Sequence, residues 1–242
     1  MKKLNLVSVL VVLSLVMLVG SSASGIIVEP SEVPQIGAMI DGLGGMDLTI
    51  DAAEYEREEG GKKWKLKDVQ VSTGWGGMGT VEIKELEFDA DPIVYNNILV
   101  SNNSNVDQNW LFTVVLPTTF GAPNMIRGSI DTSIIGTDAL LTAPVGGSVY
   151  TALIDGSGIE TLQDDPFALG TGQSATSDFQ SFGWQASLTP VGASMGIQIA
   201  FTLSPGDTAA ILSDFEITPE PGTLAMLGLG ALALLGVRRR RA

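Results

Sequence analysis

The central part of this sequence alternates short apolar runs with clusters of glycine, proline, asparagine, aspartate and serine. This alternation restricts the fold classes that the chain can adopt. Runs rich in β-branched and aromatic residues predict strands, and the clusters between them predict turns. No amphipathic helix of convincing length is visible, and strands do not alternate with helices as a parallel sheet would require. We therefore predict an all-β domain, an antiparallel β-sandwich of the jelly-roll-like or Ig-like type. The strands are expected at residues 35–40, 46–52, 63–67, 80–83, 91–100, 110–117, 125–134, 148–154, 179–188, 195–203 and 209–217.

Two pairs of neighbouring runs predict hairpins. Residues 54–67 change from glutamate-rich to lysine-rich around a Gly-Gly pair, which predicts a hairpin with cross-strand ion pairs. A short helix over residues 51–59 is the alternative for this segment. The runs at 91–100 and 110–117 flank a loop of asparagine and serine, and they predict the clearer hairpin of the two.

The N-terminus has the three parts of a secretory signal peptide. Lys2 and Lys3 precede an apolar run at residues 4–19, and small residues follow at 20–25. A basic start, an apolar centre and a small-residue end are typical of such a signal, so we predict a signal peptide over residues 1–24. An uncleaved anchor is the alternative, and the cluster of small residues argues against it.

A second apolar segment, residues 222–237, lies near the C-terminus and carries no charge. Sixteen residues at about 1.5 Å rise form a helix of roughly 24 Å, at the short edge of what a bilayer core needs, and we predict a transmembrane helix here. Arginine at a bilayer centre costs about 2.5–3.5 kcal/mol, so the cluster that follows should stay in the cytoplasm. This cluster consists of Arg238, Arg239, Arg240 and Arg241.

The tripeptide Pro219-Glu220-Pro221 comes just before the apolar segment. Proline fixes its own φ and disfavours helix at the preceding residue, so the tripeptide should be extended and accessible. Taken alone, it is typical of a helix-breaking linker in front of a membrane anchor.

The tripeptide, the apolar segment and the arginine cluster together resemble the PEP-CTERM sorting signal of Gram-negative bacteria, over residues 218–242. The resemblance implies that a membrane-embedded exosortase recognises and processes the region of the tripeptide. It also implies export through the general secretion machinery, anchoring in the inner membrane before processing, and delivery to the cell surface or the extracellular space. Proteins with this signal are often associated with exopolysaccharide and biofilm. The resemblance implies nothing about the fold of the predicted domain, residues 25–217.

The predicted exported body is strongly acidic. Residues 25–219 hold 7 basic and 26 acidic residues, a net charge of −19. Such a surface repels nucleic acid and anionic membranes, so we exclude nucleic-acid binding as the main role. The chain has no cysteine and no histidine, which excludes disulfides, Ser-His-Asp and Cys-His catalysis and ordinary zinc sites. No cofactor is expected.

The tryptophans are the first candidates for a ligand site, because Trp64, Trp75, Trp110 and Trp184 could form a sugar-stacking platform. Trp64 and Trp110 follow strand alternation and are expected in the core. Trp75 lies in the glycine-rich loop at residues 74–79 and is the candidate we select. That loop has the nominal spacing of a dinucleotide-binding motif, but a strand pattern follows it where a helix is required, so we reject the cofactor hypothesis.

Pairs of aspartates are the remaining chemical candidates. Asp89 and Asp91 are the first choice for a calcium site, because calcium takes six to eight oxygen ligands and often binds in such loops. Isolated aspartates in turns usually satisfy backbone groups instead, and no EF-hand loop is present. The other pairs are Asp41 with Asp47, and Asp164 with Asp165.

We therefore expect an exported cell-surface or matrix protein whose body is not an enzyme and is associated with exopolysaccharide. An extracellular carbohydrate- or calcium-binding module is the alternative. A hydrolase that works with two carboxylates is a third hypothesis, because the composition leaves only carboxylate chemistry open.

Overall fold

The structure, a computed structural model, describes residues 34–40, 45–48, 56–57, 63–71, 77–89, 92–119, 121, 124–170 and 177–219. Apart from Pro219, these residues belong to one compact unit, Ile27–Thr218, and they form strands and no helix. The strands are β1 (Gln35–Ile40), β2 (Gly45–Leu48), β3 (Glu56–Arg57), β4 (Lys63–Val71), β5 (Gly79–Asp89), β6 (Ile93–Asn102), β7 (Gln108–Pro117), β8 (Asn124–Ile135), β9 (Leu140–Thr142), β10 (Ser148–Ile154), β11 (Ser157–Asp164), β12 (Ala168–Gly170), β13 (Ser177–Ser187), β14 (Ser194–Leu203) and β15 (Thr208–Pro219).

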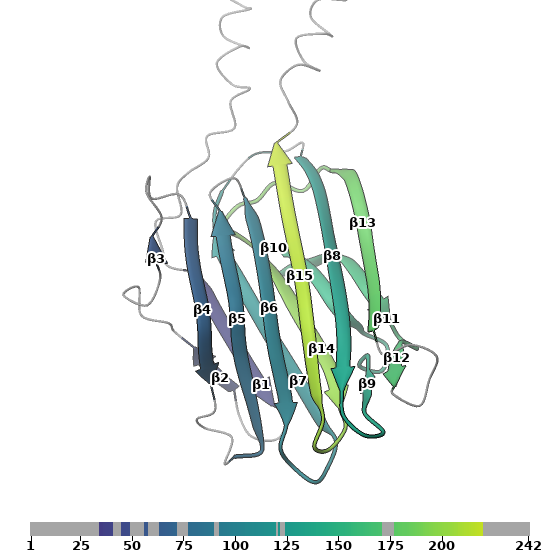
Figure 1. The fold of residues 1–242 in the computed structure, drawn as a ribbon. Coiled ribbons are helices and arrows are strands. Elements are labelled where there is room, and N and C mark those ends of the chain that lie inside the picture. The colour runs from purple at the N-terminus through teal and green to yellow at the C-terminus, as the bar shows by residue number, and fades with distance from the viewer. Residues whose placement is uncertain are drawn as a thin grey trace, which may run out of the picture. The chain divides into compact units, whose positions relative to one another are not determined.

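The strands form two sheets that lie face to face (Figure 1). The seven-stranded sheet has the order β13-β8-β15-β6-β5-β4-β3 and lies in front in the figure. The eight-stranded sheet has the order β11-β10-β14-β7-β1-β2, and β9 joins it by pairing with β14 and with β12. The pairs with a defined register are antiparallel. The prediction of an all-β antiparallel sandwich is confirmed.

The core lies between the sheets, because the strands bury alternate side chains. In β6, Val94, Ile98 and Val100 are buried, whereas Tyr95 and Leu99 lie on the other face and are only half-buried. This period of two is the one expected of a strand with one face on the core. Full burial of such a side chain stabilises a fold by about 1.5–3 kcal/mol. The largest fully buried side chains include Tyr150, Phe88, Phe201 and Phe215.

The predicted hairpin between residues 91–100 and 110–117 is wrong. Its strands lie in different sheets, since β6 pairs with β5 and β15 while β7 pairs with β1 and β14. The burial pattern shows which side of a strand faces the core. The same pattern arises whether two strands pair in one sheet or face each other from two packed sheets. The connecting loop is held by Asn102, whose side-chain amide donates to the carbonyl oxygens of Val106 (2.8 Å) and Leu203 (2.9 Å).

A second connection between the sheets lies beside the first. The turn Ser204-Pro205-Gly206-Asp207, predicted from its proline and glycine, joins β14 to β15, and Gly206 adopts a φ of +76°. The N–H of Gly206 donates to the carbonyl oxygen of Asn102 (2.8 Å), which ties the two connections together. Each sheet therefore pairs one strand of the first connection with one of the second, β6 with β15 and β7 with β14.

Other strand predictions divide into confirmed and missed ones. The hairpin at residues 54–67 is confirmed in its pairing, since β3 and β4 are antiparallel neighbours. The strands β9, β11 and β12 were not predicted. In β11, Gln163 is the one fully buried side chain, so this strand lacks the apolar alternation by which strands are found in a sequence.

The predicted signal peptide, residues 1–24, and the predicted transmembrane helix, residues 222–237, lie outside the described residues. Within the described part of the chain, no helix is long and apolar enough to cross a bilayer. The last strand, β15, ends at Pro219, the first residue of the tripeptide singled out in the sequence.

Candidate functional site

The seven-stranded sheet has an inner face on the core and an outer face turned away from it. Strand pairing aligns the outward side chains in rows that run across the sheet. In one row, Lys65 of β4 is opposite Glu87 of β5, which is opposite Tyr95 of β6, which is opposite Asp214 of β15. Ser129 of β8 continues the row, because its hydroxyl donates to the carboxylate of Asp214. Neighbouring strands are about 4.8 Å apart, so this row carries a polar chain of roughly 19 Å over five strands.

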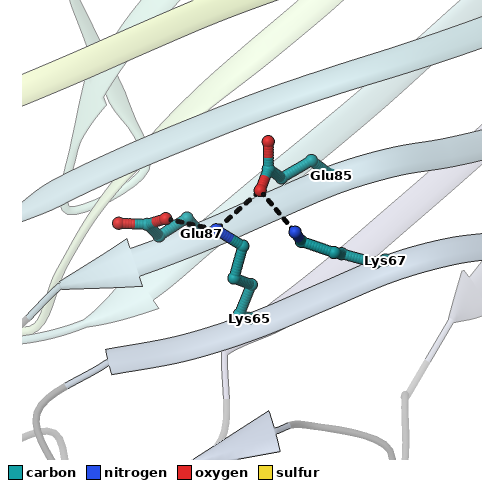
Figure 2. Close-up of polar contacts among 4 residues, drawn as sticks. All are labelled: Lys65, Lys67, Glu85 and Glu87. Carbon is teal, nitrogen blue, oxygen red and sulfur yellow. Dashed lines mark hydrogen bonds and ion pairs between the residues drawn. The ribbon is translucent and has the colours of Figure 1, made fainter. Parts of the chain in front are cut away.

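One part of this face, which we call the charged end, consists of Lys65, Lys67, Glu85 and Glu87 (Figure 2). Lys65 Nζ lies 2.6 Å from Glu85 Oε1 and 3.1 Å from Glu87 Oε2, and Lys67 Nζ lies 3.4 Å from Glu85 Oε1. The hydrogen bond from Lys65 lowers the pKa of Glu85, and the hydrogen bonds to Glu85 and Glu87 raise the pKa of Lys65. These described lysine contacts of β4 go to β5 and not to β3, where the sequence analysis had placed the cross-strand ion pairs. Positive and negative groups neutralise each other at this end.

Tyr95 lies between the charged end and the rest of the outer face. Burial raises the pKa of its phenol, and the negative charges of Glu85, Glu87 and Asp214 act in the same direction. The phenol therefore stays neutral at physiological pH and keeps a proton with which it can donate a hydrogen bond.

The opposite part of the face, which we call the aromatic end, is carried by β8, β15 and β13 and consists of Arg127, Asp131, Phe179, Trp184, Asp214 and Glu216. The guanidinium of Arg127 contacts Glu216 Oε2 through Nη2 (2.5 Å) and Nε (2.7 Å). The Cζ atom of Arg127 also lies 4.9 Å from the ring centroid of Trp184, a cation–π contact. Trp184 is nevertheless 45% exposed and Phe179 is 63% exposed, so both rings remain available to a ligand.

A β-bulge brings Trp184 to the outer face. Phe182 pairs with Gly128 and Gln185 pairs with Ile126, so Gly183 and Trp184 together lie opposite Arg127. A bulge of this kind turns a side chain away from the direction that strict alternation would give it. If β13 were a regular strand with no bulge, Trp184 and Phe182 would lie on the same face, and Phe182 packs against the core.

Two carboxylates of the aromatic end have no cation beside them in the part of the chain that the structure describes. Asp131 pairs in register with Phe179, and Asp214 accepts a hydrogen bond from the hydroxyl of Ser129. Among the described residues, neither aspartate forms an ion pair with a lysine or arginine, whereas Glu216 is neutralised by Arg127. The aromatic end therefore combines exposed rings with free negative charge.

The aromatic end rests on a buried aromatic cluster. Tyr150 spans the core from the eight-stranded sheet, and its hydroxyl donates to the backbone carbonyl oxygen of Asp214 (2.9 Å). Its ring lies 6.4 Å from that of Phe182, which lies 6.5 Å from that of Phe215. Gly128 leaves room for this cluster, because a Cβ there would lie 2.5 Å from Tyr150 Oη and 2.9 Å from the ring of Phe182. The side chains beneath thus fix the backbone of the strands that carry the outer ones.

Of the two calcium candidates, the structure describes Asp89 alone. Asp89 is the last residue of β5 and lies opposite Lys63 and Ile93 in the two neighbouring strands, while Asp91 lies outside the described residues. No group of three acidic side chains that could hold a metal ion occurs in the ranges that the structure describes.

Two other aspartates, Asp165 and Asp155, accept hydrogen bonds from backbone N–H groups, as isolated aspartates in turns usually do. Asp165 accepts a hydrogen bond from the N–H of Gly146 (3.0 Å). Asp155 accepts three, from the N–H groups of Gly192 (2.8 Å), Ala193 (2.7 Å) and Ser194 (2.9 Å). Burial alone would raise the pKa of Asp155, and the three backbone donors outweigh it, so the pKa is lowered. Asp41 lies outside the described residues, and Asp47 is described only as a backbone position in β2.

The structure describes three of the four tryptophans, Trp64, Trp110 and Trp184. Trp110 is buried in the core and Trp64 is half-buried against it, as predicted. Trp75, the selected ligand candidate, lies outside the described residues, as do Glu220, Pro221 and the cluster Arg238, Arg239, Arg240 and Arg241.

Phe179, Asp131 and Asp214 were not predicted as site residues, and Trp184 was not singled out among the tryptophans. One signal was available, since residues 179 and 182 differ by an odd number and must lie on opposite faces of a regular strand. One of these two phenylalanines therefore had to be exposed. Which one, and which acidic residues would lie beside it, depends on the pairing of β13 with β8.

Comparison with known proteins matches the C-terminus to a family model and finds distant structural similarity for the sandwich. No curated protein matches the chain in sequence. Among solved structures, TmCBM61 in complex with β-1,4-galactotriose is 9% identical, with a TM-score of 0.31 over 51% of this chain and 71% of that one. The adhesin domain of Epf from Streptococcus pyogenes is 8% identical, with a TM-score of 0.38 over 81% of this chain and 64% of that one.

A third solved structure, a cyclase from Fischerella sp. TAU, is 10% identical, with a TM-score of 0.23 over 62% of this chain and 89% of that one. Likenesses as distant as these three carry no argument about the ligand or the activity of this chain. The family comparison is different in kind, because residues 218–241 match the PEP-CTERM protein-sorting motif, as the sequence predicted. The chain therefore carries at residues 218–241 a PEP-CTERM sorting motif, which implies export, an exosortase as processing partner and sorting to the surface of a Gram-negative cell.

Proposed function

We propose that this protein is an exported surface or matrix component whose sandwich body is not an enzyme and is retained by extracellular polysaccharide. The observation that carries the proposal is the sorting motif at residues 218–241, which begins within the last strand of the sandwich. The motif shares Thr218 and Pro219 with β15, so the folded body and its sorting signal are directly continuous. A cleavage in the region of Pro219-Glu220-Pro221 would release the sandwich with all strands before that point intact.

Composition and connectivity support a binding role for the body. The chain has no histidine and no cysteine, the side chains that most often act as general base and nucleophile. The nested pairing of β6 with β15 and β7 with β14 favours the jelly-roll form of the sandwich over the Ig form. Such sandwiches serve as scaffolds for many functions, so the fold is compatible with binding and does not identify a ligand.

The sorting part of the proposal is tested by replacing Pro219-Glu220-Pro221 with three alanines in a host that has exosortase. We expect the full-length variant to stay in the membrane fraction, while the wild type is shortened and released. The matched control is the wild type in the same host without exosortase, which should behave like the variant. Normal shortening and release of the alanine variant would contradict the proposal.

A carbohydrate-binding module is the second candidate, and the exposed rings of Phe179 and Trp184 on one sheet face favour it. The calcium-binding version has less support, since Asp89 and Asp91 supply two carboxylates where calcium takes six to eight oxygens. Glycan-array binding with and without calcium separates the two versions. Binding that requires calcium would favour the metal site, and binding unaffected by a chelator would favour the aromatic end.

A further inference from the structure

We propose that the aromatic end binds an extended polysaccharide whose sugars carry free, protonated amino groups. This inference rests on the proposed function, retention of the body by polysaccharide, and it names the surface and the class of sugar. The surface is the outer face of β13 with the neighbouring parts of β8 and β15, at the edge of the seven-stranded sheet (Figure 1).

The two exposed rings suit a chain-like ligand. Phe179 and Trp184 are five residues apart on β13 with one bulge residue between them, so they are separated by roughly 13–16 Å along the strand. The apolar faces of sugar rings pack on aromatic side chains for the same reason that other apolar surfaces do, the removal of both from water. Rings at this separation can each hold one sugar of a chain that follows the strand.

Arg127 holds the ring of Trp184 in position through a cation–π contact. Its guanidinium lies over Trp184 and is held by two contacts to Glu216, so the indole is supported on one side by a fixed, neutralised pair. Arg127 is therefore a positioning residue, and its charge is not free to recruit an anionic ligand.

Charge decides which class of polysaccharide the surface favours. Asp131 is the register partner of Phe179, so their Cβ atoms are about 4.5–5.5 Å apart, and Asp214 lies one row further along the same face. Neither carboxylate has a cation beside it among the described residues, and the body as a whole carries −19. Anionic polymers are repelled by this surface, whereas an amino sugar places an ammonium group where the two carboxylates can neutralise it.

The test compares oligosaccharides of the same backbone that carry either a protonated amine or an uncharged acetamide on each sugar. The full chain, purified in detergent, is titrated calorimetrically with a glucosamine hexamer, with the N-acetylglucosamine hexamer as the uncharged match. At low salt we expect the glucosamine hexamer to bind about tenfold more tightly, because each surface ion pair contributes a modest amount. The advantage should shrink as salt is added, since the carboxylates are on the surface.

Variants assign the effect to residues. The double variant Asp131→Asn, Asp214→Asn should remove the preference for the glucosamine hexamer, and Phe179→Ala with Trp184→Ala should weaken both hexamers. The control is Asp164→Asn, which removes one carboxylate from β11 of the other sheet and should leave both affinities unchanged. Unchanged urea midpoints in all variants exclude unfolding as the cause.

Equal affinity for the two hexamers, a preference that survives the double aspartate variant, or tighter binding of an anionic galacturonate hexamer would each overturn the inference. Such a result would leave the sorting proposal standing, because that proposal is judged by shortening and release in cells. Failure of release, conversely, would not change the calorimetric comparison.

Discussion

The charged end and the aromatic end lie on one face of one sheet, built by the same antiparallel pairing, and they use charge in opposite ways. At the charged end, Lys65 contacts both Glu85 and Glu87, and Lys67 contacts Glu85. At the aromatic end, the single cation, Arg127, is occupied by Glu216 and Trp184, and two aspartates are left over. The described charges of the charged end balance one another, whereas the aromatic end keeps an excess of negative charge.

This difference teaches where a strongly acidic protein keeps its few basic residues. The body has 7 basic residues for 26 acidic ones, and those that the structure describes on this face are concentrated on β4 and β5. Surface ion pairs contribute little to stability, typically below about 1 kcal/mol each, so their placement matters more for the surface potential than for the fold. Leaving β8 and β15 without lysine keeps a negative potential beside the exposed rings.

The largest effect is expected from removing the support under the aromatic end. Phe215→Ala deletes a fully buried ring of the cluster with Phe182 and Tyr150, and it should lower the free energy of unfolding by about 3–5 kcal/mol. The matched control, Leu212→Ala, removes a 38% exposed side chain from the same strand and should change stability by less than about 1 kcal/mol. Urea denaturation of both variants decides this, and equal losses would show that the buried ring supports the aromatic end no more than an exposed side chain of the same strand does.

A smaller loss is expected from overpacking the same cluster. Gly128→Ala places a methyl group 2.5 Å from Tyr150 Oη, and relieving that contact should cost about 1–3 kcal/mol. Tyr150→Phe removes the atom that the methyl group meets. Gly128→Ala should therefore cost less stability in the Tyr150→Phe background than in the wild type. Absence of any coupling in this double-mutant cycle would contradict the packing described here.

The comparison itself is tested by removing one carboxylate at each end. Glu85→Gln breaks two ion pairs and should destabilise the protein by about 0.2–1 kcal/mol at low salt. Asp131→Asn removes the same charge where no cation of the described residues lies beside it, so stability should change by less than about 0.5 kcal/mol. Urea midpoints at low and high salt measure both, and only the Glu85 effect should diminish with salt. Two identical responses would remove the distinction between the ends.

The smallest effect is the pH dependence of the charged end. The hydrogen bond from Lys65 lowers the pKa of Glu85 below its ordinary value of 4.5, so the folded state keeps this carboxylate ionised at lower pH than the unfolded chain does. The contribution to stability is therefore complete above about pH 4.5 and is lost as pH falls through the folded-state pKa. The difference in unfolding free energy between wild type and Glu85→Gln should stay constant from pH 6 to 8 and decline in acid. A difference that grows toward low pH would reverse the assigned sign.

The local strand pattern was readable because it is carried by neighbouring residues. Period-two alternation located β10 at residues 148–154 and β14 at 195–203 within a residue of their observed bounds. The sorting motif was equally readable, since it depends on composition and order along the chain and not on a fold. The strand β11 escaped because one side chain in eight, Gln163, is fully buried.

What the sequence by itself determined is which residues form most of the strands, which side of those strands faces the core, and where the sorting signal begins. What only the tertiary structure decided is which strands are neighbours. β6 pairs with β15 and not with β7, and Lys65 contacts Glu85 on β5. Asp131 and Asp214 lie on the same sheet face as Phe179 and Trp184. The physical reason is that alternation fixes a strand's orientation toward the core within a few residues. These pairings join residues from 20 apart, as for Lys65 and Glu85, to more than 100 apart, as for Tyr95 and Asp214. Many pairings satisfy the same alternation, so the choice among them is made by the packing of the whole core.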